Sequence, residues 1–261
     1  MKEKLQIHQQ ILVENGPADS IFLYIHGIMG SPIEFKKFVE VLPLDCMHAK
    51  AILLPGHGQN GKAFAHSNYI DWQNYVNEEV ARLVQNYRQV YLMGHSMGGL
   101  LALISASKYP VNGILLLNTP IKTRISLPQI SISLRVLFAN NNHPNPLVNA
   151  YRDTFSINLS DWWTIPTWAA RLLDIDRLVK QTLSIISNIQ APVTIIQSVH
   201  DETVNPRSAE ILNQNLTKST SVIIRLNQSI HAYFPPEDLS LINNNIQKMI
   251  NKKEIKVVKS S

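Results

Sequence analysis

A serine flanked by glycines stands between two apolar runs near the middle of the chain. The pentapeptide Gly-His-Ser-Met-Gly at residues 94–98 directly follows the strand-like run 90–93 and directly precedes the helix-like run 99–104. A turn this sharp between strand and helix forces Ser96 into strained dihedral angles, and the glycines let the neighbouring backbone approach without a Cβ clash. This context predicts a serine nucleophile presented at a strand end. A serine in an ordinary glycine-flanked loop is the alternative.

Two side chains later in the chain have the types and positions needed to activate this serine. Residues 191–198 form an apolar run expected to be a buried strand, and Asp201 lies just past its end. Residues 221–226 form the next such run, and His231 lies in the loop that follows. The chain order serine, acid, histidine, with both partners after late strands, is the order that accompanies a glycine-flanked serine in a strand-turn-helix context of this kind.

Each partner of the serine has a neighbouring rival. Glu202 could replace Asp201 as the acid, but Asp201 is shorter and nearer to the strand end. His200 could replace His231 as the base, but it precedes the acid and would break the chain order. A serine hydroxyl is a poor nucleophile at neutral pH, so an imidazole must take its proton while a carboxylate holds that imidazole in the required tautomer.

Acyl transfer also needs hydrogen-bond donors for the negative oxygen of the tetrahedral intermediate. One is expected to be the N–H of Met97, which follows the nucleophile and begins a helix whose dipole favours negative charge. The other is expected in the loop after residues 21–25, where the N–H of Ile28 is the first candidate and that of Met29 the second. Loss of one such donor typically lowers the rate about a hundred- to a thousandfold.

Apolar runs of strand length alternate with helical patterns over most of the chain. This alternation predicts an α/β fold with a mostly parallel central sheet flanked by helices. Ser31 and Pro32 suit the N-cap and first turn of the helix expected over residues 33–42. The expected strands are residues 5–14, 21–25, 47–54, 90–93, 113–118, 191–198 and 221–226, and the later helices include residues 71–87 and 237–251.

The alternation of strands and helices breaks between residues 119 and 190. A gap of about seventy residues is too long for a simple crossover between two strands. We therefore expect a single domain over residues 1–261, with a small helical cap over residues 121–188. The cap is expected after the sixth strand, lying over Ser96.

Aromatic side chains in the expected cap and histidines near the serine are candidates for contact with a substrate. Trp162, Trp163 and Trp168 form either an apolar roof over an acyl chain or the filling of the cap's own core. His95 adjoins the nucleophile and is a candidate substrate contact. His26, His57 and His95 lack metal-ligand spacing and are interpreted as packing residues near the pocket.

Several segments together resemble the carboxylesterase and monoacylglycerol-lipase branch of the α/β-hydrolase superfamily. The matching segments are His-Gly-Ile-Met-Gly at 26–30, Leu-Pro-Gly-His-Gly at 54–58, Gly-His-Ser-Met-Gly-Gly at 94–99, residues 197–206 and Ser-Ile-His at 229–231. They run from residue 21 to about 235, which is nearly the whole chain. The resemblance implies the α/β-hydrolase fold and an activity on carboxylic esters.

The resemblance also implies a role for each matching residue. These roles are the nucleophile Ser96, the base His231, the acid Asp201, and the oxyanion donors Ile28 and Met97. The chain departs from the family pattern at Ile230, because the family usually has a glycine just before the histidine. This difference bears on the geometry of the histidine loop.

Composition argues against several other classes of protein. Cys46 is the only cysteine among 261 residues, so no internal disulfide can form. No phosphate loop, dinucleotide fingerprint or metal-ligand spacing occurs, so we expect neither a cofactor nor a metal. The net charge of +5 includes five lysines after residue 247, interpreted as a solvated helix end rather than as a site for nucleic acid or lipid.

The expected activity is that of a serine carboxylic-ester hydrolase working through an acyl-enzyme on Ser96. Its substrate would be a small-molecule ester with an apolar acyl group. Peptide hydrolysis, thioester hydrolysis or acyl transfer by the same triad are alternatives, and so is ligand binding without turnover. Residues 1–6 lack the apolar core of a signal peptide and no run approaches a membrane span, so we expect a cytoplasmic enzyme without stable membrane insertion.

Overall fold

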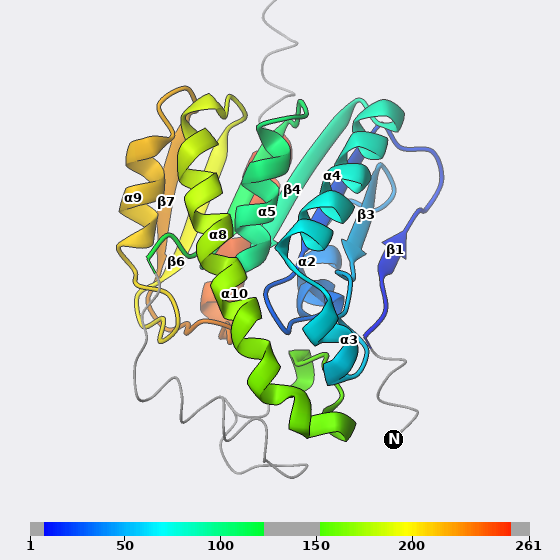
Figure 1. Cartoon of the computed structure of the whole chain (residues 1–261). Coiled ribbons are helices and arrows are strands. Elements are labelled where there is room, and N and C mark those ends of the chain that lie inside the picture. Colours follow the sequence, from blue (N-terminus) through cyan, green and yellow to red (C-terminus); the bar gives the residue numbers. More distant parts are fainter. Residues whose placement is uncertain (1–7, 123–151, 252–261) are drawn as a thin grey trace, which may run out of the picture.

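Seven strands form one sheet at the centre of the molecule (Figure 1). The computed structural model describes residues 8–122 and 152–251. In this part of the chain the strand order is β1-β3-β2-β4-β5-β6-β7, and only β1 runs antiparallel to its neighbour. The strands are β1 (Ile11–Val13), β2 (Ser20–Ile25), β3 (Met47–Ile52), β4 (Gln89–His95), β5 (Gly113–Leu117), β6 (Val193–Ser198) and β7 (Ser221–Leu226).

The inner strands are continuous apolar runs because both faces of the sheet are covered. Successive side chains of a strand point to opposite faces. Along β4, Leu92 therefore enters one core, whereas Tyr91 and Met93 enter the other. The two cores fix the register of the sheet, since a shift by one residue would exchange the contents of both.

Helices cover each face of the sheet. In the view of Figure 1, α4, α5 and α8 lie in front of the strands. The core on this face draws on α3 (Gly61–His66), α4 (Tyr69–Asn86), α5 (Met97–Ala106), η2 (Leu159–Trp168), α8 (Ala169–Ile185), η3 (Ile186–Asn188) and α9 (Ser208–Asn215). The core on the opposite face draws on η1 (Pro32–Phe35), α2 (Lys36–Val39) and α10 (Pro236–Asn251). No helix of the described residues is long and apolar enough to cross a bilayer.

The N-terminal elements differ from the expected ones in length and capping. The helix expected over residues 33–42 is a 3-10 turn followed by α2, which ends at Val39. Ser31 makes no capping bond, because its hydroxyl lies 3.0 Å from Nδ1 of His8 instead. The edge strand expected over residues 5–14 is reduced to β1, whose three residues are the ones that pair with β3; residues 5–7 lie outside the described residues.

The long insertion follows β5, the fifth described strand, and not a sixth strand as expected. The run expected over residues 113–118 is also the fifth of the strands expected from the sequence, so the two lists of strands agree and only the number given for the position of the cap was wrong. Residues 123–151 of the expected cap lie outside the described residues. Leu178 and Val179 of α8 are buried in the same core as α4 and α5, so this part of the insertion packs on the body of the domain. A separate cap over residues 121–188 stays a prediction.

The C-terminal ends of the parallel strands carry the three candidate site residues, whereas the cysteine lies at an N-terminal end. Cys46 is exposed in the loop that leads into the N-terminal end of β3. The loops that hold Ser96, Asp201 and His231 follow the C-terminal ends of β4, β6 and β7. Because β3 runs parallel to β2, and β2 to β4, the thiol and the three polar side chains lie at opposite edges of the sheet.

Candidate active site

Ser96 occupies a strained turn between β4 and α5. Its φ of 52° and ψ of −125° lie outside the usual regions for a residue with a Cβ, as expected from the sequence. The backbone of the turn packs closely against β2, because a Cβ on Gly98 would lie 2.0 Å from the carbonyl oxygen of Ile25. The Ser96 N–H donates to the carbonyl of Leu117 on β5 at 2.8 Å. Neighbouring strands therefore maintain a conformation that costs about 1–3 kcal/mol by itself.

The structure brings the three residues expected to form a triad into one row. Nε2 of His231 lies 3.1 Å from Oγ of Ser96, and Nδ1 of His231 lies 3.0 Å from Oδ2 of Asp201. All three side chains are buried. Strands β4, β6 and β7 carry them to the same edge of the sheet, which explains how residues 135 positions apart become hydrogen-bonded neighbours.

Asp201 is held ionised by the groups around it. Burial raises the pKa of its carboxyl, but His231 and the N–H groups of Val204 and Thr203 lower it further, so the net shift is downward. The two amides donate to Oδ1 at 2.7 and 2.8 Å, which leaves Oδ2 for the imidazole. Since an ionised carboxylate can only accept, Nδ1 of His231 carries the proton and Nε2 presents its lone pair to Ser96.

The His231 imidazole has a pKa above its ordinary value. Burial lowers this pKa, but the charge and hydrogen bond of Asp201 raise it, with smaller contributions from Glu202 and Glu34 in the same direction. A more basic imidazole takes the serine proton more readily. The environment of His231 therefore matches the role of a general base.

The structure separates the two carboxylates that compete for the role of acid. Asp201 faces the imidazole, whereas Oε2 of Glu202 accepts the main-chain N–H of His231 at 3.1 Å. The rival base His200 is exposed, and the row of hydrogen bonds runs through His231 instead. The geometry thus favours Asp201, preferred from its length and its place nearer to the strand end, and His231, preferred from chain order.

The loop between β2 and η1 lies against the turn at Ser96. It carries Ile28 and Met29, the two candidates for the oxyanion donor that is not Met97. A Cβ on Gly27 would lie 3.0 Å from Cβ of Ser96. The Met29 N–H donates to Nε2 of His57 at 3.1 Å, so this amide is already occupied. Neither the Ile28 N–H nor the Met97 N–H has a protein acceptor among the described residues. These two amides are therefore the ones available to a substrate oxygen.

Two buried histidines fix the shape of this loop as neutral imidazoles. Burial lowers the pKa of His57 to about 4, and burial together with the neighbouring His57 lowers that of His26 well below its ordinary value. Nε2 of His26 accepts the N–H of Leu54 at 3.1 Å, and Nε2 of His57 accepts that of Met29. An imidazolium could accept neither bond. Sequence reasoning recognised both as packing residues but missed this accepting role, which spacing alone does not reveal.

His95 has a different set of partners from the one expected. Nδ1 lies 3.0 Å from Oε2 of Glu34, and Nε2 lies 2.9 Å from the main-chain oxygen of His231. Both ring nitrogens are thus occupied by the protein. Asn118, which sequence reasoning also missed, donates through Nδ2 to the same oxygen at 2.9 Å. Contact between His95 and a substrate stays a prediction without a free nitrogen to support it.

The three tryptophans of the insertion have different environments. Trp168 is buried, packs against Phe64 and donates through Nε1 to the carbonyl of Gly61. Trp162 and Trp163 are 66% and 64% exposed, with their rings edge to face. Trp168 therefore fills a core, whereas the other two have apolar surface available to a ligand.

Asp161 fastens η2 to the body of the domain. Its two carboxylate oxygens accept the N–H groups of Gly61 and Lys62 at 2.9 and 2.7 Å. These amides begin α3, where a negative charge is favoured. Trp168, at the other end of η2, also bonds to the start of α3, because its Nε1–H donates to the carbonyl of Gly61. No motif marks Asp161, because its partners lie about a hundred residues earlier in the chain.

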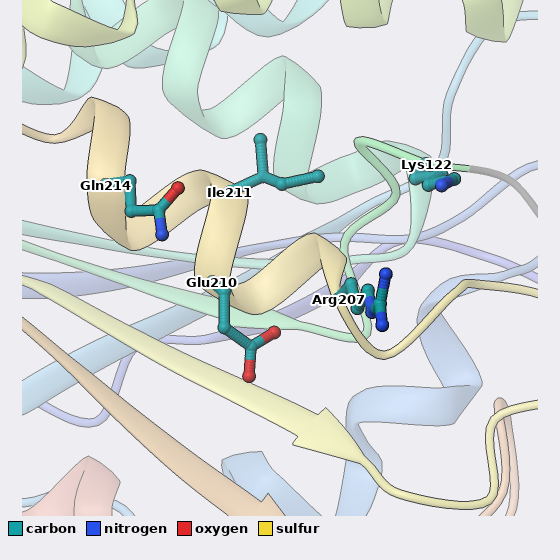
Figure 2. Close-up of a pocket in the computed structure, with 5 residues that line it drawn as sticks. All are labelled: Lys122, Arg207, Glu210, Ile211 and Gln214. Carbon is teal, nitrogen blue, oxygen red and sulfur yellow. The ribbon is translucent and has the colours of Figure 1, made fainter.

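A surface hollow of about 540 Å³ lies beside α9, and Figure 2 shows the residues that line it. It is lined by Lys122, Arg207, Glu210, Ile211 and Gln214. Glu210 is already ion-paired with Arg225, so the charges around the hollow are partly balanced. Among the described residues, no group of three or more His, Cys, Asp or Glu side chains is arranged to hold a metal ion.

Two proteins of known structure share the fold described above. A monoacylglycerol lipase from Paleococcus ferrophilus aligns with a TM-score of 0.68 at 17% identity, over 92% of this chain and 97% of that chain. MenH from S. aureus aligns with a TM-score of 0.56 at 18% identity, over 93% of this chain and 99% of that chain. At this level of identity the two likenesses establish the fold alone.

Sequence comparison identifies the family. A thermostable monoacylglycerol lipase from Bacillus sp. (strain H-257) is 29% identical over 225 residues, which are 84% of this chain and 84% of that protein. Residues 16–237 match the family Hydrolase_4, described as serine aminopeptidase, S33. The chain therefore belongs to the Hydrolase_4 family, in the lipase and esterase branch of the α/β-hydrolase superfamily.

Proposed function

We propose that the protein hydrolyses carboxylic esters through an acyl-enzyme on Ser96. The observation that carries this proposal is the row of hydrogen bonds from Ser96 through His231 to Asp201, with the N–H groups of Ile28 and Met97 available beside it. A nucleophile, a base, an orienting carboxylate and two oxyanion donors are the groups that acyl transfer requires.

The proposed reaction passes through two tetrahedral intermediates. The Ser96 oxygen attacks the ester carbonyl while its proton moves to Nε2 of His231. The Ile28 and Met97 amides bind the resulting oxyanion, and the imidazolium gives its proton to the departing alcohol. A water molecule then transfers a proton to His231 and attacks the acyl-enzyme. Collapse of the second intermediate releases the carboxylic acid and returns the proton to Ser96.

We propose substrates with short- to medium-chain acyl groups or monoacylglycerols. The Bacillus relative named as a monoacylglycerol lipase supports this class. The exposed rings of Trp162 and Trp163 support an apolar acyl group, since they offer unburied aromatic surface on the insertion. If they cover the acyl chain, activity on p-nitrophenyl esters peaks above two carbons, and Trp162→Ala or Trp163→Ala shifts that optimum. An unchanged profile would remove both residues from the acyl site.

The test of the mechanism is the loss of turnover and of labelling in Ser96→Ala. A serine that acts as one unit with its base supports about a millionfold of kcat, so turnover should fall to background. A fluorophosphonate probe should label the wild type and leave Ser96→Ala unlabelled. Ser184→Ala removes an exposed serine hydroxyl and serves as the matched control. Substantial hydrolysis by a clean Ser96→Ala preparation would refute the acyl-enzyme.

Other acyl-transfer chemistry uses the same groups, and the family description names an aminopeptidase. A putative 2-succinyl-6-hydroxy-2,4-cyclohexadiene-1-carboxylate synthase from Haemophilus influenzae is 33% identical over 85 residues, about a third of each chain. Fold and triad do not separate these activities, because function lies in the substrate pocket. Parallel assays on esters, thioesters and aminoacyl amides distinguish them. A larger kcat/KM for aminoacyl amides than for esters would replace the ester proposal with a peptidase.

A further inference from the structure

The main chain of His231 is held by side chains that the triad itself does not use. Oε2 of Glu202 accepts its N–H at 3.1 Å. Its carbonyl oxygen lies 2.9 Å from Nε2 of His95 and 2.9 Å from Nδ2 of Asn118. These contacts come from the ends of β4 and β5 and from the loop after β6. Three separate segments therefore converge on one peptide unit beside the proposed base.

The loop that carries His231 depends on such contacts. Residues 227–235 form neither helix nor strand, so no ladder of backbone bonds fixes them. Asn118 Nδ2 and Ser198 Oγ also donate to the carbonyl of Ile230, at 3.3 and 3.1 Å. Asn118 has a φ of 48°, a left-handed conformation that asparagine tolerates better than most residues. Side-chain donors thus replace secondary structure at this point of the chain.

The two ring nitrogens of His95 have different partners. The main-chain oxygen of His231, at Nε2, can only accept a hydrogen bond, so Nε2–H of His95 is the donor to it. Nδ1, on the other side of the ring, lies 3.0 Å from Oε2 of Glu34. The contact with Glu34 therefore holds the ring in the orientation that directs Nε2–H at the oxygen of His231.

Glu34 has no other polar side-chain partner among the described residues. Its side chain is 11% exposed, and Oε1 is buried without a hydrogen bond in the described part of the chain. Burying a carboxyl group with one partner is unfavourable unless that partner is well placed. Glu34 and His95 therefore form a second carboxyl–imidazole contact, beside that of Asp201 and His231. The ring centroids of His95 and His231 are 5.0 Å apart.

We propose that Glu34 and His95 are positioning residues that hold the proposed base through its main chain. Glu34 keeps Nε2–H of His95 directed at the carbonyl of His231, and this bond sets how closely the His231 ring approaches Ser96. The proposal rests on the proposed function, because it assigns these two residues to the same reaction. A displacement of about 1 Å at a reacting group lowers turnover about a hundredfold.

The test begins with two variants assayed on a p-nitrophenyl ester. His95→Phe keeps the ring volume but removes the donor, and Glu34→Leu removes the partner of Nδ1. We expect each to lower kcat about ten- to a hundredfold with KM within about threefold, because alignment is lost and substrate contacts are not. Fluorophosphonate labelling of Ser96 should slow by a similar factor.

Glu34→Gln provides the rescue. Its amide N–H donates to Nδ1 of a neutral His95, which leaves Nε2–H for the carbonyl of His231. This variant should recover most of the kcat that Glu34→Leu loses. Combining Glu34→Leu with His95→Phe should cost no more than either change alone if the pair acts as a unit. Glu40→Gln, at an exposed carboxylate just after α2, is the matched control.

Three outcomes would overturn the proposal. One is wild-type kcat in both Glu34→Leu and His95→Phe. Another is a rise in KM at constant kcat, which would make His95 a substrate contact. The third is a loss in Glu34→Gln as large as that in Glu34→Leu at equal urea unfolding midpoints. A wild-type protein that neither hydrolyses esters nor takes up the probe would instead refute the proposed function.

Discussion

At the scale of single residues, the chemistry of the site depends on the opposed shifts of two ionisable groups. The pKa of His231 is raised although burial alone would lower it, and the pKa of Asp201 is lowered although burial alone would raise it. Each shift has the same principal cause, which is the contact between the two side chains. Without the Asp201 carboxylate, the pKa of His231 would depend on burial, which lowers it, and on the smaller contributions of Glu202 and Glu34, which raise it.

This balance predicts the acid limb of the pH–rate profile. His231 must be neutral to accept a proton, so kcat/KM should fall as pH drops through its raised pKa, above the ordinary value of about 6.5. Asp201→Asn should move the midpoint to lower pH, and should also lower kcat about ten-thousandfold because the tautomer is no longer fixed. Measurement of kcat/KM from pH 4 to 9 tests both effects. Equal midpoints in the two proteins would contradict this account.

The hydrogen-bonded row of Ser96, His231 and Asp201 could be predicted from sequence because each of these residues follows a recognisable apolar run. Ser96 has its glycine-flanked turn, and Asp201 and His231 follow the last two expected strands. Glu34 and Asn118 could not be found in this way. Their contacts with His95 and His231 join side chains to partners 61 and 113 positions away, and no spacing or periodicity marks such bonds.

At the scale of elements, the loop between β2 and η1, which carries the proposed oxyanion donor Ile28, is held from two sides. On one side, His57 accepts the Met29 N–H, and Met29 has a left-handed φ of 58°. On the other side, the main-chain N–H of Ser156 donates to the Met29 carbonyl at 2.9 Å. The peptide groups flanking Met29 are thus both engaged. The preceding peptide group, which carries the Ile28 N–H, is held through the Gly27 carbonyl, which accepts the Gly30 N–H at 3.1 Å.

His57→Ala should disturb this loop without touching the nucleophile. The Met29 N–H loses its acceptor, so we expect the Ile28 donor to be misplaced and kcat to fall about ten- to a hundredfold, less than for complete loss of a donor. His66→Ala removes an exposed histidine from the neighbouring α3 and is the control. Steady-state kcat on one ester, with circular dichroism to verify folding, makes the comparison. Equal kcat in both variants would show that His57 does not hold the donor.

The elements of the sheet were easier to predict than the pieces around them. β5 and β7 begin at the expected residues because apolar runs of strand length are strong signals. The helix expected over residues 33–42 is present over residues 32–39 in two short pieces, but its expected cap is absent, since the Ser31 hydroxyl lies 3.0 Å from Nδ1 of His8 instead. The sequence predicts that α8 belongs to an inserted cap, but in the structure Leu178 of α8 is buried in the same core as α4 and α5.

At the scale of the whole molecule, the turn at Ser96 between β4 and α5 is part of the core. β4 lies at the centre of the strand order, and every residue of α5 from Met97 to Ser105 is buried. A Cβ on Gly99 would lie 1.9 Å from Oγ1 of Thr119, so α5 packs against the loop after β5 too closely for any side chain at position 99. Stability and site geometry are therefore properties of the same contacts.

Gly98→Ala should destabilise the fold as well as the site. The added methyl would overlap the carbonyl oxygen of Ile25, which is backbone and cannot rotate away, so we expect a loss of about 1–3 kcal/mol or more. Gly113→Ala is the control, because its methyl would meet the flexible side chain of Met249 at 2.9 Å. Urea unfolding of both variants measures the difference. A smaller loss for Gly98→Ala than for Gly113→Ala would contradict the packing described for the turn.

The solitary thiol of Cys46 makes this chain unusually convenient to handle. A maleimide-linked dye or a surface tether has one attachment point, at the rim of the sheet remote from Ser96. Molecules fixed through that point would all hold the Ser96 end of the sheet in the same orientation relative to the surface. Rotational or single-molecule measurements could then follow turnover without any engineered cysteine.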